Sequence, residues 1–294
     1  MTAQDWFFAV RPKTLPASMI PVVLGSASAW YHEGCVWWVA VCALVCSMLI
    51  QIITNFVNQV YDFRKGADTD ARVGPMNPVA TGMISDRYML RVAVVLTTIT
   101  FCLGLLLVWR GGLPIFLIGV VSLVCAYLYT AGPAPLAYKG LGDVFVFIFF
   151  GVVAVCGTHY AHTLTLSVDV LLLSCAPGAL SCNILTVNNI RDSATDVLVG
   201  KRTLAVRFGN QFALHMYGAM MVVAFAVPFG MVLCGLHPVV CMVCGLAIPA
   251  WHLYHDVQIH TGTALNPVLA GTGKLLAQYG IVMTVLMMIA WWMK

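Results

Sequence analysis

Charge is what this sequence has least of. Only 9% of its 294 residues are Asp, Glu, Lys or Arg, whereas 61% are hydrophobic. An ordinary soluble domain carries about 25% charged residues, so this chain has too little charge to cover a water-facing surface. The scarcity excludes an ordinary soluble protein and favours one whose solvent is lipid. No linker rich in Ser, Pro or Gly interrupts the chain, so we expect a single domain over residues 1–294.

Apolar stretches long enough to cross a bilayer, which takes roughly 20 residues, recur along the whole chain. We identify about nine, at 14–33, 36–57, 88–109, 113–131, 142–161, 168–190, 212–235, 238–255 and 275–293. No Lys, Arg, Asp or Glu lies in the middle third of any stretch, where each charge would cost about 2.5–3.5 kcal/mol. We therefore expect an all-α integral membrane protein with about nine transmembrane helices.

Basic residues gather on one side of this predicted topology. The N-terminus and the loops after the even-numbered spans share a face that collects all but two of the 15 Lys and Arg residues, the exceptions being Arg110 and Lys294. The positive-inside rule then predicts a cytoplasmic N-terminus in a multi-pass protein of the cytoplasmic (inner) membrane. The rule does not place acids, yet seven aspartates share the basic face: Asp62, Asp68, Asp70, Asp86, Asp143, Asp192 and Asp196. Acids gathered among bases indicate a site facing the cytoplasm.

A short pattern repeats at the ends of the second and sixth predicted spans. Asn58 and Asp62 form an Asn-x-x-x-Asp pattern, and Asn188 and Asp192 form another. Four spans separate the two copies. The repetition predicts two similar four-helix halves plus a ninth helix, around a central cavity open to the cytoplasmic side.

Each repeated pattern places oxygen-bearing side chains on one helix face. At about 100° per residue, Asn55, Asn58 and Asp62 fall within an arc of about 60°, and the residues of the second pattern fall within about 100°. Mg²⁺ prefers oxygen ligands and is usually held by one or two carboxylates with substrate phosphates. Two such stripes on facing helices therefore predict Mg²⁺ bridged by a diphosphate, with Lys and Arg neutralising the remaining phosphate charge.

These motifs resemble those of a known family. The first, Asn55-x-x-Asn58-Gln59-x-x-Asp62-x-x-x-Gly66-x-Asp68, resembles the first aspartate-rich motif of the UbiA superfamily of intramembrane prenyltransferases. The second, Asn188-Asn189-x-Arg191-Asp192-x-x-x-Asp196-x-x-x-Gly200-Lys201-x-Thr203-Leu204-Ala205-x-Arg207-x-Gly209, resembles its second motif. The family usually has Asn-Asp where this chain has Asn58-Gln59, so this chain lacks one acid of the family's usual metal arrangement.

Two further segments resemble the branch that prenylates 1,4-dihydroxy-2-naphthoate. They are Arg11-Pro12-Lys13-Thr14-Leu15-Pro16 and Tyr129-Thr130-x-Gly132-Pro133-x-Pro135-Leu136-x-Tyr138-x-Gly140-Leu141-Gly142-Asp143. This resemblance implies Mg²⁺-dependent transfer of a polyprenyl group from polyprenyl diphosphate to the naphthoate. CO₂ and diphosphate are lost and demethylmenaquinol is formed. The expected partners are these two substrates and the bilayer, with no nucleic acid and no obligate protein partner.

The resemblance also implies roles for individual residues. The metal-binding, catalytic acids would be Asp62, Asp68, Asp192 and Asp196. The substrate-binding residues would be Arg11, Asn58, Arg64, Tyr129, Tyr138, Lys139, Asn188, Asn189, Lys201 and Arg207. Tyrosine faces near the reacting carbon would stabilise positive charge by cation–π attraction.

Three alternatives stay open at this point. A secondary transporter would also contain internal repeats, but its site would lie at mid-membrane, where this chain has no acid. A CDP-alcohol phosphotransferase is echoed only by the fragment Asp70-Ala71-Arg72. Within the prenyltransferases, the acceptor could be 4-hydroxybenzoate, homogentisate, haem or a chlorophyll precursor.

Overall fold

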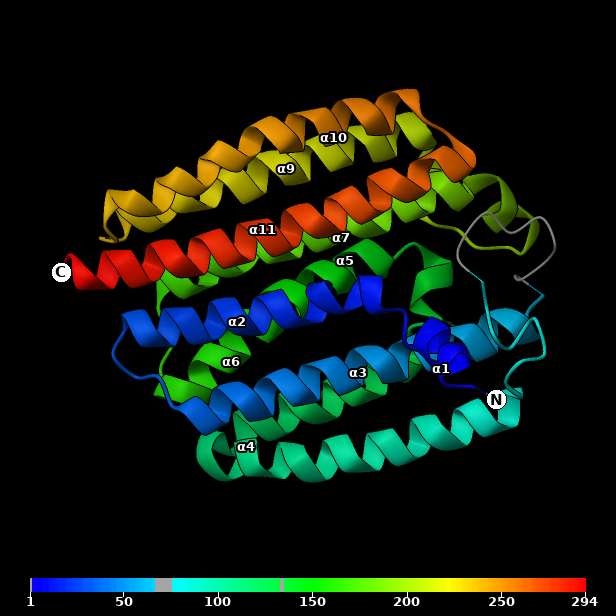
Figure 1. The fold of residues 1–294 in the computed structure, drawn as a ribbon, viewed down its shortest axis with the longest axis horizontal. Coiled ribbons are helices and arrows are strands. Elements are labelled where there is room, and N and C mark those ends of the chain that lie inside the picture. The colour runs from blue at the N-terminus through cyan, green and yellow to red at the C-terminus, as the bar shows by residue number, and fades with distance from the viewer. Residues whose placement is uncertain (1, 67–75, 133–134) are drawn as a thin grey trace.

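The computed structural model describes residues 2–66, 76–132 and 135–294, and every regular element in these ranges is a helix. The long helices lie side by side along the horizontal axis of Figure 1. They are α2 (Leu15–Tyr31), α3 (Trp37–Arg64), α4 (Asp86–Leu128), α7 (Val168–Leu198), α9 (Asn210–Leu233) and α11 (Leu265–Trp292). Two further long segments are continuous runs of shorter elements: α5 (Gly142–Phe147), η3 (Ile148–Val153) and α6 (Ala154–Thr163) form one, and η4 (Pro238–Leu246) and α10 (Ala247–Ile259) form the other. The short elements are α1 (Ala3–Val10), α8 (Leu204–Phe208), η1 (Pro12–Thr14), η2 (Leu136–Lys139) and η5 (Gly262–Ala264).

The expected membrane class is confirmed. Among the described residues, 7 helical segments are long and apolar enough to cross a membrane. One of them, α4, contains Gly112 with φ 66° and ψ −153°, followed by Pro114. A positive φ suits glycine, and at this point the helix folds back into the two arms visible in Figure 1. The expected spans 88–109 and 113–131 lie on these two arms, whereas the total number of crossings stays a prediction.

Helix α7 is the most buried of these segments. In its most apolar window, 72% of the residues are buried inside the bundle, against 17% for α4. The π-helical turn η3 packs closely on α7, because a Cβ on Gly151 would lie 2.6 Å from the Ser174 carbonyl oxygen and 2.9 Å from the Gly178 Cα. Glycine allows this approach. The second motif is thus attached to the best-packed helix of the bundle.

The second and third helices of each predicted half pack against each other. Helix α3 lies along α4, and α7 lies along α9. This packing is what two related halves would show, and their structural equivalence stays a prediction.

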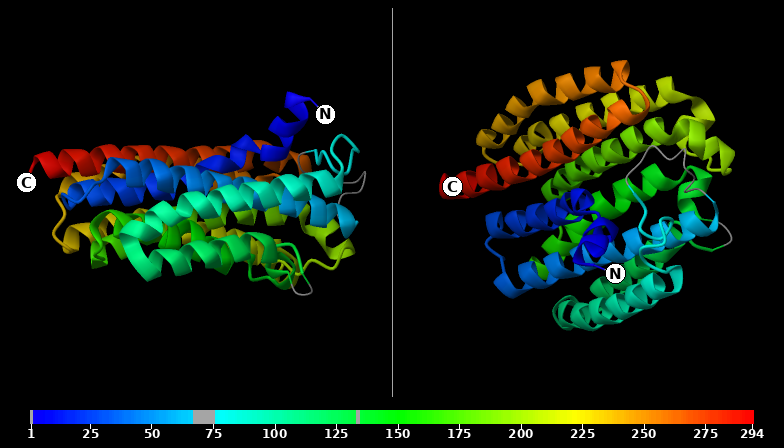
Figure 2. Two further views of the ribbon diagram at one scale, coloured as in Figure 1. Left: turned by 90° about the horizontal axis from the view of Figure 1, so that it is seen from below. Right: turned by 45° about the vertical axis from the view of Figure 1, so that its right-hand side comes forward.

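Both motifs lie at one end of the bundle, which we call the motif end. The helix α3 continues to Arg64 and α7 to Leu198, so Asp62, Asp192 and Asp196 lie on regular helix beyond the predicted spans. The described parts of the loops after α3, α4 and α7 (76–85, 135–141 and 199–203) gather at the right of Figure 1, and α1 projects from the same end in Figure 2. Arg202 N–H donates to the Tyr138 carbonyl at 3.0 Å, which joins two of these loops.

The opposite end of the bundle, the far end, carries the two exceptional cations. Arg110 Nη2 donates to the His162 carbonyl at 2.9 Å, and Lys294 Nζ donates to the Tyr31 carbonyl at 2.9 Å. Both cations therefore lie away from the motif end, as the charge pattern predicts.

Candidate functional site

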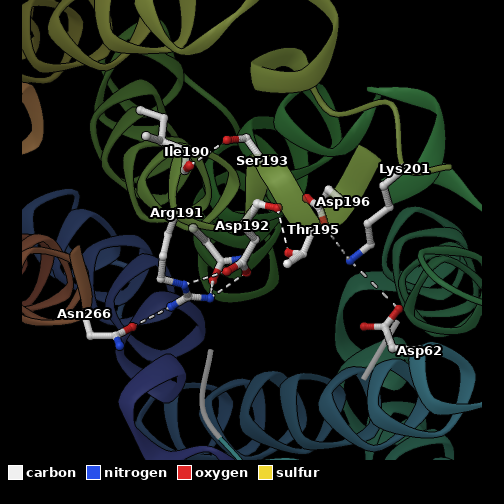
Figure 3. A network of polar contacts seen from close by, with 10 residues as sticks. Asp62, Ile190, Arg191, Asp192, Ser193, Thr195, Asp196, Lys201 and Asn266 are labelled. Atoms are coloured by element: carbon white, nitrogen blue, oxygen red, sulfur yellow. Dashed lines mark hydrogen bonds and ion pairs between the residues drawn. The ribbon is translucent and has the colours of Figure 1, made fainter. Parts of the chain in front are cut away.

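Acids from the two motifs meet at Lys201. Its Nζ lies 3.6 Å from Asp196 Oδ1 on α7 and 4.0 Å from Asp62 Oδ1 on α3 (Figure 3). The three side chains are 20%, 10% and 15% exposed, respectively. One ammonium group thus bridges carboxylates 134 positions apart in the printed sequence. The structure brings together one acid from each predicted half.

Tyr138 and Lys65 form the other side of this cluster. Tyr138 Oη donates to Asp62 Oδ1 at 3.0 Å, while burial and the Asp62 carboxylate raise the pKa of its phenol. Lys65 Nζ lies 4.0 Å from the centre of the Tyr138 ring and donates to the Thr130 carbonyl at 2.9 Å. Thr130 Oγ1 in turn donates to Asn58 Oδ1. Asp62 is therefore contacted by the Lys201 ammonium and the Tyr138 phenol, and Lys65 lies against the ring of that tyrosine.

Asp192 belongs to a second, neighbouring network (Figure 3). The Arg191 guanidinium donates two parallel hydrogen bonds to the Asp192 carboxylate, from Nε to Oδ1 at 2.8 Å and from Nη2 to Oδ2 at 2.7 Å. The same guanidinium donates to Asn188 Oδ1 at 2.6 Å and to Asn266 Oδ1 on α11 at 2.9 Å. The Arg191 side chain is only 2% exposed, so this network holds the orientation of Asp192 and Asn188.

A long cavity of about 410 Å³ extends from this end into the bundle. Arg11, Asn58 and Asn188 line it at the motif end, and Leu107, Ile115 and Ala161 line it toward the far end. Since Asn58 precedes Asp62 by about one helical turn and Asn188 likewise precedes Asp192, the polar networks lie next to the motif end of the cavity, which we call its mouth. Its volume is within the range of about 300–1,000 Å³ typical of small-molecule sites.

Gln59 lies outside the cluster. It is fully buried, and its Nε2 donates to the carbonyls of Ala9 at 2.8 Å and Asn55 at 2.9 Å. Asn77 Nδ2 donates to the Gln59 carbonyl at 2.9 Å. The side chain ties α1 to α3, because it points about 100° away from Asn58 on the helix. The missing acid at position 59 therefore removes no carboxylate from the cluster around Lys201.

The other predicted site residues differ in whether they lie at the cavity or on the surface. Arg64 lies on the surface, paired with Asp86 at 2.8 Å, and is not part of the cluster. Lys139 and Arg207 are exposed, with the Arg207 side chain beside Gly140. Tyr129 and Arg11 line the cavity, Asn189 is 7% exposed, and Asp68 lies outside the described residues.

Three residues of these networks received no role from the sequence: Thr130, Arg191 and Asn266. Arg191 and Thr130 stand inside the quoted motifs, so motif membership could have identified them. Asn266 has no such signal, because it reaches the site only through the packing of α11 against α7.

The donor set fits a hard divalent cation. Asp62 and Asp196 offer carboxylate oxygens, which Mg²⁺ prefers, and a cation already lies between them in the form of the Lys201 ammonium. Within the described ranges, no three His, Cys, Asp or Glu side chains form a ready-made metal cage. Such a site suits Mg²⁺ that enters with substrate phosphates rather than a permanently caged metal.

Acids and cations at the mouth of a largely apolar cavity, within a helical membrane bundle, define a class of protein. This class handles an amphiphile with an anionic head and a long apolar tail. The comparisons give the family: residues 18–269 match the UbiA prenyltransferase family, and the chain belongs to it. The protein is therefore a prenyltransferase.

Named relatives cover almost the whole chain. It is 36% identical over 286 residues to 1,4-dihydroxy-2-naphthoate octaprenyltransferase of Mycobacterium leprae, covering 94% of each. It is 36% identical over 271 residues to the Mycobacterium tuberculosis protein of the same name, covering 92% of this chain and 91% of that one. The solved structure of a UbiA homolog from Archaeoglobus fulgidus bound to DMAPP and Mg²⁺ has a TM-score of 0.68 at 16% identity, covering 96% of this chain and 99% of that one. That likeness shows the shared fold.

Proposed function

We propose that this prenyltransferase transfers a polyprenyl group from polyprenyl diphosphate to 1,4-dihydroxy-2-naphthoate in an Mg²⁺-dependent reaction. The products are demethylmenaquinol, CO₂ and diphosphate. The relatives named for this acceptor and the two segments around Arg11 and Tyr129 support it. The observation that carries the proposal is the meeting of Asp62 and Asp196 at Lys201, at the mouth of the apolar cavity.

The motif-end cluster is the proposed diphosphate site. Asp62 and Asp196 would hold Mg²⁺, with Asp192 and Asp68 as the further acids of the two motifs. When bound, the metal would neutralise charge that builds on the leaving diphosphate. Lys201 supplies positive charge beside both carboxylates and Lys65 adds a second ammonium at the Tyr138 ring, so they favour an anionic head at this place.

The cavity is the proposed binding site for the prenyl chain. Its aromatic wall includes Phe101, Phe145 and Phe149, and burying an apolar chain there is favourable by roughly 25 cal/mol per Å². Binding of the prenyl chain in the cavity would hold the diphosphate head next to the motif-end cluster. The allylic carbon then lies between the charged cluster and the apolar wall.

Two further groups are proposed to act at the reacting carbon. Breaking the allylic C–O bond leaves positive charge on carbon, which the π-faces of Tyr129 and Tyr138 attract. The electron-rich ring of the naphthoate forms the new C–C bond, and its carboxylate leaves as CO₂. Arg11, which lines the cavity, is placed to bind either that carboxylate or the phosphate.

The proposed orientation follows from charge. The motif end, which carries most Lys and Arg residues, would face the cytoplasm in the inner membrane. A single domain over residues 1–294 would contain the whole site. Cysteine labelling from either side of sealed vesicles tests the orientation.

The test is a reaction with purified protein, Mg²⁺, octaprenyl diphosphate and a panel of aromatic acceptors, read by product mass. We expect a prenylated, decarboxylated product from the naphthoate and none from 4-hydroxybenzoate or homogentisate. Asp62→Ala and Asp192→Ala should abolish the product, whereas Asp86→Ala, which breaks only a surface ion pair, should not. Full activity in both motif variants would refute the site, and a product from another acceptor would refute the substrate.

A further inference from the structure

The cavity has two chemically different walls. Between η1 and α3 its lining includes the polar residues Thr14, Ser47, Gln51 and Thr54, whereas the lining contributed by α4 to α7 is mostly aliphatic and aromatic. A prenyl chain needs only apolar surface. The polar wall therefore has no role in holding the chain and is free to recognise a second, more polar substrate.

Gln51 is a buried, hydrogen-bonded group on this wall. It is 9% exposed, and its Nε2 donates to Thr14 Oγ1 at 3.3 Å and to Asn55 Oδ1 at 3.4 Å. Asn55 Nδ2 donates to the Val10 carbonyl at 2.9 Å and to Thr14 Oγ1 at 3.0 Å. The Thr14 hydroxyl donates to the Arg11 carbonyl at 2.9 Å.

This network determines which atom of the Gln51 amide is available. The Val10 carbonyl can only accept, so the nitrogen of Asn55 must face it and the Asn55 oxygen must face Gln51. The Thr14 hydroxyl already donates its proton to the Arg11 carbonyl, so toward Gln51 it can only accept a hydrogen bond. Both N–H donors of Gln51 are thus used, and no described residue donates to its Oε1. An oriented hydrogen-bond acceptor remains on a residue that lines the cavity.

We propose that Gln51 Oε1 accepts a hydrogen bond from a hydroxyl of the aromatic acceptor and so selects the reduced, hydroxylated ring over its oxidised quinone. This inference rests on the proposed function, since it assigns a subsite for the second substrate. A quinone carbonyl has no proton to donate and would oppose Gln51 Oε1 with another acceptor. A hydroxyl that donates to the amide also leaves the ring more electron-rich for attack on the allylic carbon.

The position of Gln51 agrees with this role. It lies on the same face of α3 as Asn58 and Asp62, about two and three helical turns deeper, or roughly 10 and 16 Å at about 1.5 Å per residue. A ring placed between the diphosphate cluster and Gln51 would meet the allylic carbon at one edge and Gln51 at the other. Arg11 lies at the shallow end of the same wall, where a ring carboxylate would be nearest to positive charge.

The first test uses Gln51→Met, a variant of similar volume that lacks the oxygen. We expect the KM for the naphthoate to rise about 10-fold or more, as befits loss of an oriented buried hydrogen bond, while the KM for octaprenyl diphosphate changes less than about twofold. The matched control is Gln258→Met, the same substitution at an exposed glutamine of α10 that lies outside the cavity lining. Both KM values should stay at wild-type levels in this control.

The second test needs only the wild-type enzyme. Naphthalene-1,4-diol, its mono- and dimethyl ethers and the quinone are compared as competitive inhibitors against the naphthoate under anaerobic conditions. We expect the dimethyl ether and the quinone to bind at least about 10-fold more weakly than the diol, and Gln51→Met to remove most of that difference.

The outcomes separate the two ideas. Equal inhibition by diol, dimethyl ether and quinone overturns the role of Gln51, as does a parallel rise of both KM values in Gln51→Met. A wild-type enzyme that transfers no prenyl group to any aromatic diol overturns the proposed function itself. If Gln51→Met does not fold, the wild-type inhibitor series decides the matter.

Discussion

Replacing Lys201 with Met removes the ammonium group that lies between Asp196 and Asp62. At 3.6 and 4.0 Å each attraction is worth about 4 kcal/mol at an effective dielectric constant of about 20. Desolvation and the ordering of the side chain offset most of this gain. We therefore expect Lys201→Met to lower the free energy of unfolding by about 1–3 kcal/mol in metal-free buffer, because two carboxylates then face each other without a counterion.

The same substitution should strengthen Mg²⁺ binding in the absence of diphosphate. In the wild type a divalent cation competes with the Lys201 ammonium for the same oxygens, and in the variant it does not. A ligand at about 100 times its Kd stabilises a protein by about 2.7 kcal/mol. Added Mg²⁺ should therefore restore the stability of Lys201→Met to wild-type levels or above. The KM for polyprenyl diphosphate should rise at least about 10-fold in this variant, because Lys201 no longer binds the phosphate.

The assay is thermal unfolding of the detergent-purified protein, first with EDTA and then across an Mg²⁺ titration, with binding measured by calorimetry. Lys139→Met is the matched control, because Lys139 is exposed at the same end and makes no ion pair with the described residues. It should resemble the wild type at every Mg²⁺ concentration. If Lys201→Met were as stable as the wild type in EDTA and bound Mg²⁺ no more tightly, the bridging role would be wrong.

Three other substitutions separate structural from catalytic roles. Gln59→Leu should destabilise the protein by about 1–3 kcal/mol through lost buried hydrogen bonds yet leave the Mg²⁺ requirement unchanged; a shifted requirement in a metal titration would place Gln59 at the metal. Arg191→Met should cost about 1–3 kcal/mol of stability, since Asn188 and the partly exposed Asp192 then lose their donor; unfolding at the wild-type temperature would contradict this. Tyr138→Phe should lower kcat about 10-fold or more by freeing Asp62, without altering the fold by circular dichroism, and an unchanged kcat would exclude Tyr138 from the reaction.

The sequence alone determined the class of protein and the position of its site along the chain. Long uncharged stretches predict membrane helices because the cost of burying a charge in lipid is a local property of each stretch. The repeated Asn-x-x-x-Asp pattern pointed to Asp62 and Asp192, and Asp196 follows Asp192 one helical turn later on the same face. Family membership, too, could be recognised from the motifs around them.

Only the tertiary structure decided which of these groups work together. Lys201 forms ion pairs with both Asp62 and Asp196. Asp192 instead pairs with Arg191, and Arg64 pairs with Asp86 on the surface. None of this can be obtained from spacing, because the rotation of each helix is set by the neighbours that it packs against. Gln59 shows the reason most clearly. A rotation of about 100° from Asn58 takes its side chain out of the cluster and into the packing between α1 and α3, where it is a structural residue rather than a missing ligand.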